Sequence, residues 1–159
     1  MSDLPKTVRA WNYASLGTPR KVVTLNNAFP TPPAPKGSSL LVRVSHCALN
    51  PVGAVTMATV PSFMRRCPAI PEIDFSGTIV TAGPSAPSQF PVGTKVCGAY
   101  TVAAARSGIG ALAEYIEISE ENAGFAVVPE GMGMDEAAGL QCMGQTAVAM
   151  CESAGVKKG

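Results

Sequence analysis

Residues 70–80 read Ile-Pro-Glu-Ile-Asp-Phe-Ser-Gly-Thr-Ile-Val, and this stretch decides the fold of the chain. From Phe75 onward it is rich in β-branched residues and ends at Gly83-Pro84, which is typical of a β-strand closed by a turn. Glu72 and Asp74 are spaced by two, so in an extended chain they share a face. We interpret them as structural carboxylates that accept backbone donors, with a functional carboxylate pair as the alternative.

Outward from this strand, the sequence predicts mostly strands up to Pro129. Residues 40–48 alternate with a period of two, which predicts a half-buried strand that carries a satisfied, partly buried His46, with a general base as the alternative role for this histidine. Four prolines in residues 29–36 predict an extended crossing within the domain, with a ligand for an SH3-type domain as the alternative. Further strands are expected at 8–13, 21–25, 92–96, 113–118 and 126–128, the first two as a hairpin around residues 14–19.

Helices are predicted in two places. Asn50-Pro51 puts Asn at an N-cap and Pro at the first helical position, leading into a short helix that reaches Ala58. After Pro129, residues 134–139 begin a helix with two acidic residues in its first turn, and residues 145–154 form a second helix that Gly155 closes.

Composition excludes several classes of protein. Of the 159 residues, 47% are hydrophobic and 14% are charged, which excludes a disordered chain and is enough for one domain with a buried core. A formal net charge of +1 favours neither nucleic acid nor an anionic membrane as a partner. Because there is no apolar run of membrane-helix length and no signal-peptide pattern near the start, we expect a cytoplasmic protein.

The residue types that carry most chemistry are scarce. One histidine and five scattered cysteines without a C-x-x-C pair argue against zinc and indicate reduced, mostly buried thiols. The sequence has no G-x-S-x-G elbow, and it has neither of the glycine-rich phosphate loops, so this chain does not hold a complete nucleotide site by itself. Four methionines are expected in the core rather than on a lipophilic binding wall: Met132, Met134, Met143 and Met150.

Eight short segments occur in a recognisable order along the chain. They are residues 49–53, 70–80, 92–98, 110–115, 128–132, 136–140, 145–147 and 154–159. Together they resemble the N-terminal catalytic domain of the medium-chain dehydrogenase/reductase superfamily. Within it the chain is most similar to the zinc-independent branch of quinone oxidoreductases and trans-acting enoyl reductases.

The resemblance implies a mainly β fold with short helices, a GroES-like, partly open β-barrel. Residues 1–131 would form the GroES-like catalytic domain, and residues 132–159 a helical connector to a Rossmann domain that this chain lacks. Asn50 stands where zinc-dependent relatives have their first cysteine ligand, and Ile73 where they have a histidine. Both departures imply the metal-free branch, with no zinc.

The resemblance also implies a site. Asn50, Pro51, Val52 and Gly53 would lie near the nicotinamide of NADPH, and Gln141, Cys142, Met143 and Thr146 would line the substrate side. No catalytic residue is assigned. Gly53 stands where the family usually carries an aspartate, so a carboxylate that would help to fix this loop is missing from that position.

The function implied is reduction of a quinone or an enone/enoyl substrate by hydride from a nicotinamide. By this interpretation the chain is the catalytic-domain part of an NADPH-dependent oxidoreductase and is inactive without a dinucleotide-binding domain. The alternatives are a non-catalytic GroES-like binding module, which forms an oligomer or meets a partner domain through the apolar tail 132–151, and an inactive truncated paralogue.

Overall fold

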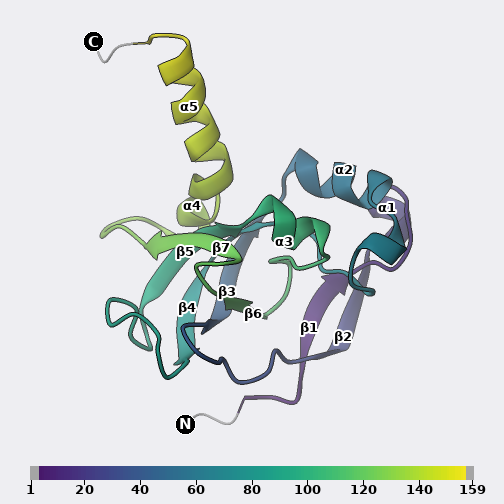
Figure 1. The fold of residues 1–159 in the computed structure, drawn as a ribbon, viewed down its shortest axis with the longest axis horizontal. Helices are drawn as coiled ribbons and strands as arrows, with labels where there is room; N and C mark the ends of the chain where they lie inside the picture. The colour runs from purple at the N-terminus through teal and green to yellow at the C-terminus, as the bar shows by residue number, and fades with distance from the viewer. Residues whose placement is uncertain (1–3, 157–159) are drawn as a thin grey trace.

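The chain folds around a five-stranded antiparallel sheet with a two-stranded hairpin beside it (Figure 1). The computed structural model describes residues 4–156. The strands are β1 (Thr7–Asn12), β2 (Thr24–Pro30), β3 (Leu40–Ala48), β4 (Asp74–Ala82), β5 (Lys95–Tyr100), β6 (Tyr115–Ile118) and β7 (Ala123–Val127). The larger sheet has the order β6-β3-β4-β5-β7, and β1 pairs with β2. The strand that the opening stretch predicted therefore lies at the centre of the sheet.

Backbone hydrogen bonds tie the hairpin to the larger sheet near the start of β6. Trp11 N donates to Leu112 O at 3.0 Å, and Glu114 N donates to Arg9 O at the same distance. Within residues 4–156 the two sheets do not close into a barrel. This arrangement confirms the mainly β, partly open architecture with short helices.

The core lies along β4 and its neighbours. Phe75 and Ile79 of β4 are fully buried, as are Val42 of β3 and Val96 of β5. Tyr100 packs against Phe75 with 6.1 Å between ring centroids. Burying side chains of this size contributes about 1.5–3 kcal/mol each, so β4 is firmly anchored between its neighbours.

The bounds predicted for β3 are confirmed, but its alternation is not. Leu40, Leu41 and Val42 are all buried, and His46 is exposed. The register shifts between Leu41 and Val42 and again between Val44 and His46. At the second shift β3 contains one extra residue, Ser45, and such a bulge reverses which face the following residues occupy, so the prediction of a partly buried His46 was wrong.

Two predicted strands are displaced. Lys21 and Val22 belong to a short helix, α1 (Pro19–Val22), which has proline in its first turn, and β2 starts after it. β5 begins at Lys95, so residues 92–94 form the turn before the strand. The proline-rich segment is irregular after Pro30, and Pro35 is buried, which supports a crossing within the domain.

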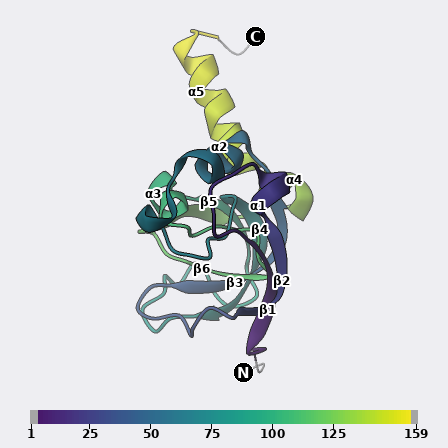
Figure 2. The same cartoon turned by 90° about the vertical axis from the view of Figure 1, so that its right-hand side faces the viewer.

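The remaining helices are α2 (Pro51–Thr59), a 3-10 turn (Ser62–Met64), α3 (Val102–Arg106), α4 (Met134–Ala138), the π-helical segment η2 (Leu140–Gly144) and α5 (Gln145–Ser153). The two helices predicted after Pro129 are confirmed, and Gly155, with φ 67°, follows α5. α4 is anchored because Ala137 and Ala138 are buried and Ser76 Oγ donates to Met134 O. By contrast, every residue of α5 is exposed, and the helix projects from the body in both views (Figures 1 and 2).

The cysteines are free thiols, but the expectation that most are buried was wrong. Cys97 on β5 is buried, whereas Cys67 and Cys151 are exposed. Cys67 lies in the loop that leads to β4, and Cys151 lies on the projecting α5. Cys47 and Cys142 are half-buried.

Substitution of Gly77 by alanine is expected to destabilise the sheet. An added Cβ would lie 2.5 Å from both Arg43 O and Val42 Cγ1, so β3 and β4 would have to separate. We expect a loss of about 1–3 kcal/mol in the free energy of unfolding, measured by urea titration. Gly139→Ala is the control, because its nearest contact is an ordinary 3.8 Å. Equal stability of the two variants would contradict this account.

Candidate cofactor and substrate site

Asp74 joins the two segments that the sequence predicts as the site. This first residue of β4 is fully buried. Its Oδ2 accepts a hydrogen bond of 2.7 Å from Asn50 Nδ2, and its Oδ1 accepts one of 3.1 Å from Cys142 N. The candidate cofactor turn at Asn50 and the candidate substrate segment η2 are therefore held on one carboxylate.

Glu72 is the second buried carboxylate, with 8% of its surface exposed. Its Oε2 accepts a hydrogen bond of 2.8 Å from Asn50 N. Both acids thus accept N–H donors, which confirms their interpretation as structural carboxylates. They do not share a strand face as expected, because β4 begins at Asp74 and Glu72 has a φ of 65°.

Burial dominates the electrostatics of this pair. It raises the pKa of Asp74 and of Glu72 above their usual values, while the hydrogen bonds from Asn50 oppose that rise in each. The charge of Asp74 raises the pKa of Glu72 further. Burial, followed by the two carboxylates, raises the pKa of the neighbouring Cys47 thiol to about 12, so Cys47 stays protonated and is unsuited to act as a nucleophile.

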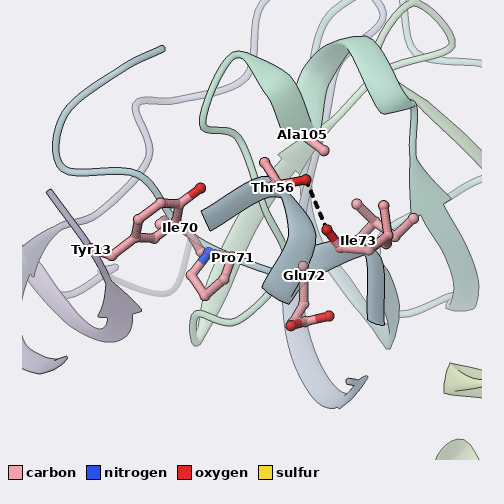
Figure 3. Close-up of a pocket in the computed structure, with 9 residues that line it drawn as sticks. Tyr13, Thr56, Ile70, Pro71, Glu72, Ile73 and Ala105 are labelled. Carbon is pink, nitrogen blue, oxygen red and sulfur yellow. Dashed lines mark hydrogen bonds between the residues drawn. The ribbon is translucent and has the colours of Figure 1, made fainter. Parts of the chain in front are cut away.

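A small pocket lies between α2 and the loop before β4, lined by Tyr13, Val52, Glu72 and Ile73 among others (Figure 3). Its volume of 20 Å³ has room for about one water molecule. Thr56 Oγ1 donates to Val52 O at 2.8 Å inside it, drawn as the dashed line. A substrate does not fit in this pocket.

The four predicted cofactor residues differ in access. Pro51 is exposed, Val52 is half-buried, and Asn50 and Gly53 are buried. Asn50 uses its amide nitrogen on Asp74, and none of the residues 4–156 donates a hydrogen bond to its Oδ1. The Oδ1 atom of Asn50 can therefore accept a hydrogen bond from a group outside the chain. Gly53 packs directly against the Glu72 carboxylate.

The predicted substrate residues lie on η2 and the start of α5. Gln141 and Cys142 are half-buried, and Met143 and Thr146 are exposed. Thr146 Oγ1 donates to Cys142 O at 2.7 Å, so its hydroxyl oxygen can still accept a hydrogen bond. Gln141 is turned toward β7, since a Cβ added to Gly124 would lie 3.0 Å from its Nε2. Met143 and Thr146 therefore offer the accessible side chains.

Large apolar side chains are exposed around these segments. The core interpretation of the methionines was wrong for Met143 and Met150, which are 52% and 67% exposed, and Met132 and Met134 are half-buried. Sequence reasoning also missed five other exposed apolar side chains, which no periodicity marks: Leu49, Val55, Phe63, Met64 and Val102. We use the name apolar surface for the six exposed side chains that lie next to or on α2, η2 and α5: Leu49, Val55, Leu140, Met143, Val148 and Met150.

In the part of the chain that the structure describes, no three His, Cys, Asp or Glu side chains gather in a group that could hold a metal ion. No helix among residues 4–156 is long and apolar enough to cross a membrane.

Comparison with known proteins assigns the family. Residues 36–130 match the profile of the alcohol dehydrogenase GroES-like domain. The chain belongs to this family, within the medium-chain dehydrogenase/reductase superfamily. The matched residues of this GroES-like domain run from just before β3 to just after β7 and so include Asn50 and Asp74.

Curated relatives of this GroES-like domain are reductases. It is 30% identical to the medium chain reductase pydE of Acremonium sp., covering 98% of this chain and 48% of that protein. It is 34% identical to the trans-enoyl reductase gkaC of Penicillium citrinum, covering 74% of this chain and 32% of that protein. The quinone oxidoreductase of Coxiella burnetii superposes with a TM-score of 0.80 at 26% identity, over 96% of this chain and 46% of that one. The chain thus spans half or less of the length of these relatives and is an oxidoreductase catalytic-domain-like region.

The buried acids are expected to give the stability of the domain a distinctive pH dependence. Because burial raises the pKa of Asp74 and Glu72 in the folded state, the folded chain binds more protons than the unfolded chain between the two values. Their full contribution to the free energy of unfolding is present below a pH of about 4, the pKa of such carboxyl groups in the unfolded chain. It is lost as the pH rises through their higher pKa in the folded chain. Urea titrations at a series of pH values should therefore show a smaller change of stability with pH in Asp74→Asn and Glu72→Gln.

The exposed Glu130→Gln serves as the control for this measurement. Its slope of unfolding free energy against pH should match that of the unmodified chain. If both buried-site variants kept the same slope as well, the burial effect would be refuted.

Proposed function

We propose that this GroES-like domain is the catalytic part of a cytoplasmic reductase that passes hydride from NADPH to a quinone or an activated alkene, as in enoyl reduction. The observation that supports it best is the shared carboxylate of Asp74, which holds the Asn50 turn and η2 together. Similarity to proteins described as trans-enoyl reductase and quinone oxidoreductase points to the same chemistry.

In this proposal the chain binds and orients the reactive end of the cofactor. The nicotinamide lies against the turn Asn50 to Gly53, where Pro51 and Val52 offer apolar surface and Asn50 Oδ1 accepts from the carboxamide. Asp74 fixes the rotamer of Asn50 by binding its other amide atom. NADPH, when bound, supplies the hydride.

The substrate would lie against η2 and the start of α5. Met143 provides a flexible apolar contact that adapts to different ring or chain shapes. Thr146 holds its hydroxyl on Cys142 O and presents the oxygen outward. The half-buried Gln141 and Cys142 lie beside these two residues and complete the surface. No side chain of this chain is assigned as the proton donor.

The proposed domain organisation places the catalytic domain at residues 1–131 and a helical connector at 132–159. A dinucleotide-binding domain, in the same polypeptide or in a second one, would cover the apolar surface. Two observations favour it: the relatives are at least about twice as long as this chain, and every residue of α5 is exposed. Closing the site in this way would exclude water from the hydride path.

A second candidate is a non-catalytic binding module. The exposed side chains of α5, among them Val148 and Met150, would then meet a second copy of this chain. Analytical sedimentation tests this candidate, because a monomer whose mass does not depend on concentration would argue against self-association. A stable dimer without cofactor affinity would favour the binding module.

Activity is expected to depend on a dinucleotide-binding domain. The 159-residue chain alone should neither bind NADPH tightly nor oxidise it with quinones or enones, because the chain has no glycine-rich phosphate loop. The same chain fused to the C-terminal half of the Acremonium reductase should do both, as followed by NADPH absorbance. Turnover by the chain alone would disprove the dependence, and a fusion that binds NADPH but reduces none of a panel of quinones and enones would disprove the reductase proposal.

The reaction of this fusion is expected to be independent of metal. Asn50 donates to Asp74, and Ile73 has no ligand atom, so the positions that bind zinc in relatives of the other branch cannot do so here. Prolonged dialysis against EDTA should leave the rate within about 20% of the starting value, since zinc ligation needs nitrogen, sulfur or carboxylate donors. Loss of activity that added zinc restores would show the opposite.

A further inference from the structure

Helix α2 lacks the usual side chains at its first turn. Asn50 is its N-cap, with an extended backbone, but its side chain caps nothing on the helix and binds Asp74 instead. Pro51 and Val52 follow, and the third helical position is Gly53. In a capping box the side chain at this third position reaches back to the N–H of the N-cap, and glycine has no side chain to do so.

The Asn50 N–H nevertheless has a carboxylate acceptor, and it comes from another part of the chain. Glu72 Oε2 accepts it at 2.8 Å, in a buried contact 22 positions away in sequence. The same carboxylate occupies the space that a side chain at position 53 would need. A Cβ added to Gly53 would lie 2.3 Å from Glu72 Oε1 and 2.7 Å from its Cδ.

The backbone of Glu72 is held in an unfavourable conformation to make this contact. Among residues 4–156, Glu72 is the non-glycine residue with a positive φ, at 65°. Its carbonyl accepts Ala111 N at 2.9 Å, and the carbonyl of Pro71 accepts Leu112 N at 3.2 Å. These two bonds pin the loop, and such strain persists where the surroundings over-determine the backbone.

We infer that Glu72 is a positioning residue that caps α2 from outside the helix, taking the place of a side chain at position 53. Its negative charge also lies at the positive end of the helix dipole. Gly53 is required because the carboxylate fills the space beside it. Asn50 is thereby held by two acids, its backbone N–H by Glu72 and its side chain by Asp74.

The capping itself is independent of the proposed function, but its consequence for cofactor binding rests on it. If the Asn50 turn contacts the nicotinamide, Glu72 sets the position of that turn without touching the cofactor. The first experiment therefore uses the 159-residue chain without cofactor, and the second uses the fusion protein described above.

The first experiment moves the carboxylate from one position to the other. Four proteins are compared by NMR hydrogen exchange of the Asn50 amide: the unmodified chain, Glu72→Gly, Gly53→Glu and the double variant. Glu72→Gly should speed exchange of this amide about tenfold or more, because the acceptor is lost. Gly53→Glu alone should also disturb the turn, since two carboxylates compete for one site. The double variant should regain most of the protection, because a third-position glutamate closes an ordinary capping box.

Two further variants keep the test decisive if Glu72→Gly changes the loop through its freer backbone. Glu72→Gln retains an acceptor oxygen without the charge and should keep more protection than Glu72→Gly. The exposed Glu121→Gln is the control and should leave the exchange unchanged. Unaltered protection in Glu72→Gly, or additive losses in the double variant, would overturn the capping role.

In the fusion protein, Glu72→Gly should raise KM for NADPH several-fold more than it lowers kcat, and the double variant should reverse that rise. If the variant lost activity only in proportion to its loss of folded protein, the positioning role would be overturned. If the fusion has no activity at all, the reductase proposal fails, while the amide-exchange result still decides the capping.

Discussion

The structure depends on the burial of one carboxylate. Asp74 is fully buried at the start of the central strand, where an unpaired ion would be strongly destabilising. Each of its two oxygens is matched by an N–H donor, one from Asn50 and one from Cys142. Because both donors must be in place for the carboxylate to be tolerated, the need to satisfy Asp74 fixes how the α2 turn and η2 lie relative to β4.

The position of that carboxylate is in turn set by the core. The residue after Asp74 is Phe75, which is fully buried and packs against Tyr100, and Ile79 lies further along the same strand. Strand β4 has β3 on one side and β5 on the other. A polar anchor at the end of such a strand moves little, so segments bound to it inherit the rigidity of the sheet. This is the arrangement that a site for positioned reactants requires.

Local patterns sufficed for most strands and helices, and they failed where distant contacts decide. The bounds of β3 and the Asn50-Pro51 helix start follow from residue types nearby in sequence. The exposure of His46 does not, because it depends on the bulge at Ser45 in the pairing with β4. The meeting of Asn50 with Cys142 was implied by the family resemblance, but the acid that joins them could not be assigned, since hydrogen bonds over 24 and 68 positions leave no periodic signal.

The contrast between local patterns and distant contacts also explains why the exposure of two methionines and the source of the carboxylate beside Gly53 could not be predicted. Apolar side chains on a helix predict burial against something, but the sequence does not state what, and Met143 and Met150 are exposed in this chain. Gly53 lacks the acid expected at its position, yet an acid is present there in space, contributed by Glu72. The carboxylate beside the first turn of α2 therefore comes from a residue that is distant in sequence.

The distribution of polar and apolar groups argues for a site that is one wall of a closed cleft. Its anchors, Asp74 and Glu72, are buried, and each accepts at least one hydrogen bond from within the chain, on both oxygens in Asp74 and on Oε2 in Glu72. The outer face offers one amide oxygen, one hydroxyl and the apolar surface. Left in water, such a face would bind ligands weakly, because water competes for the few polar atoms and the apolar contacts are one-sided. Covered by a second wall, the same face would meet the requirement of the hydride transfer proposed above, which needs two reactants held together with water excluded.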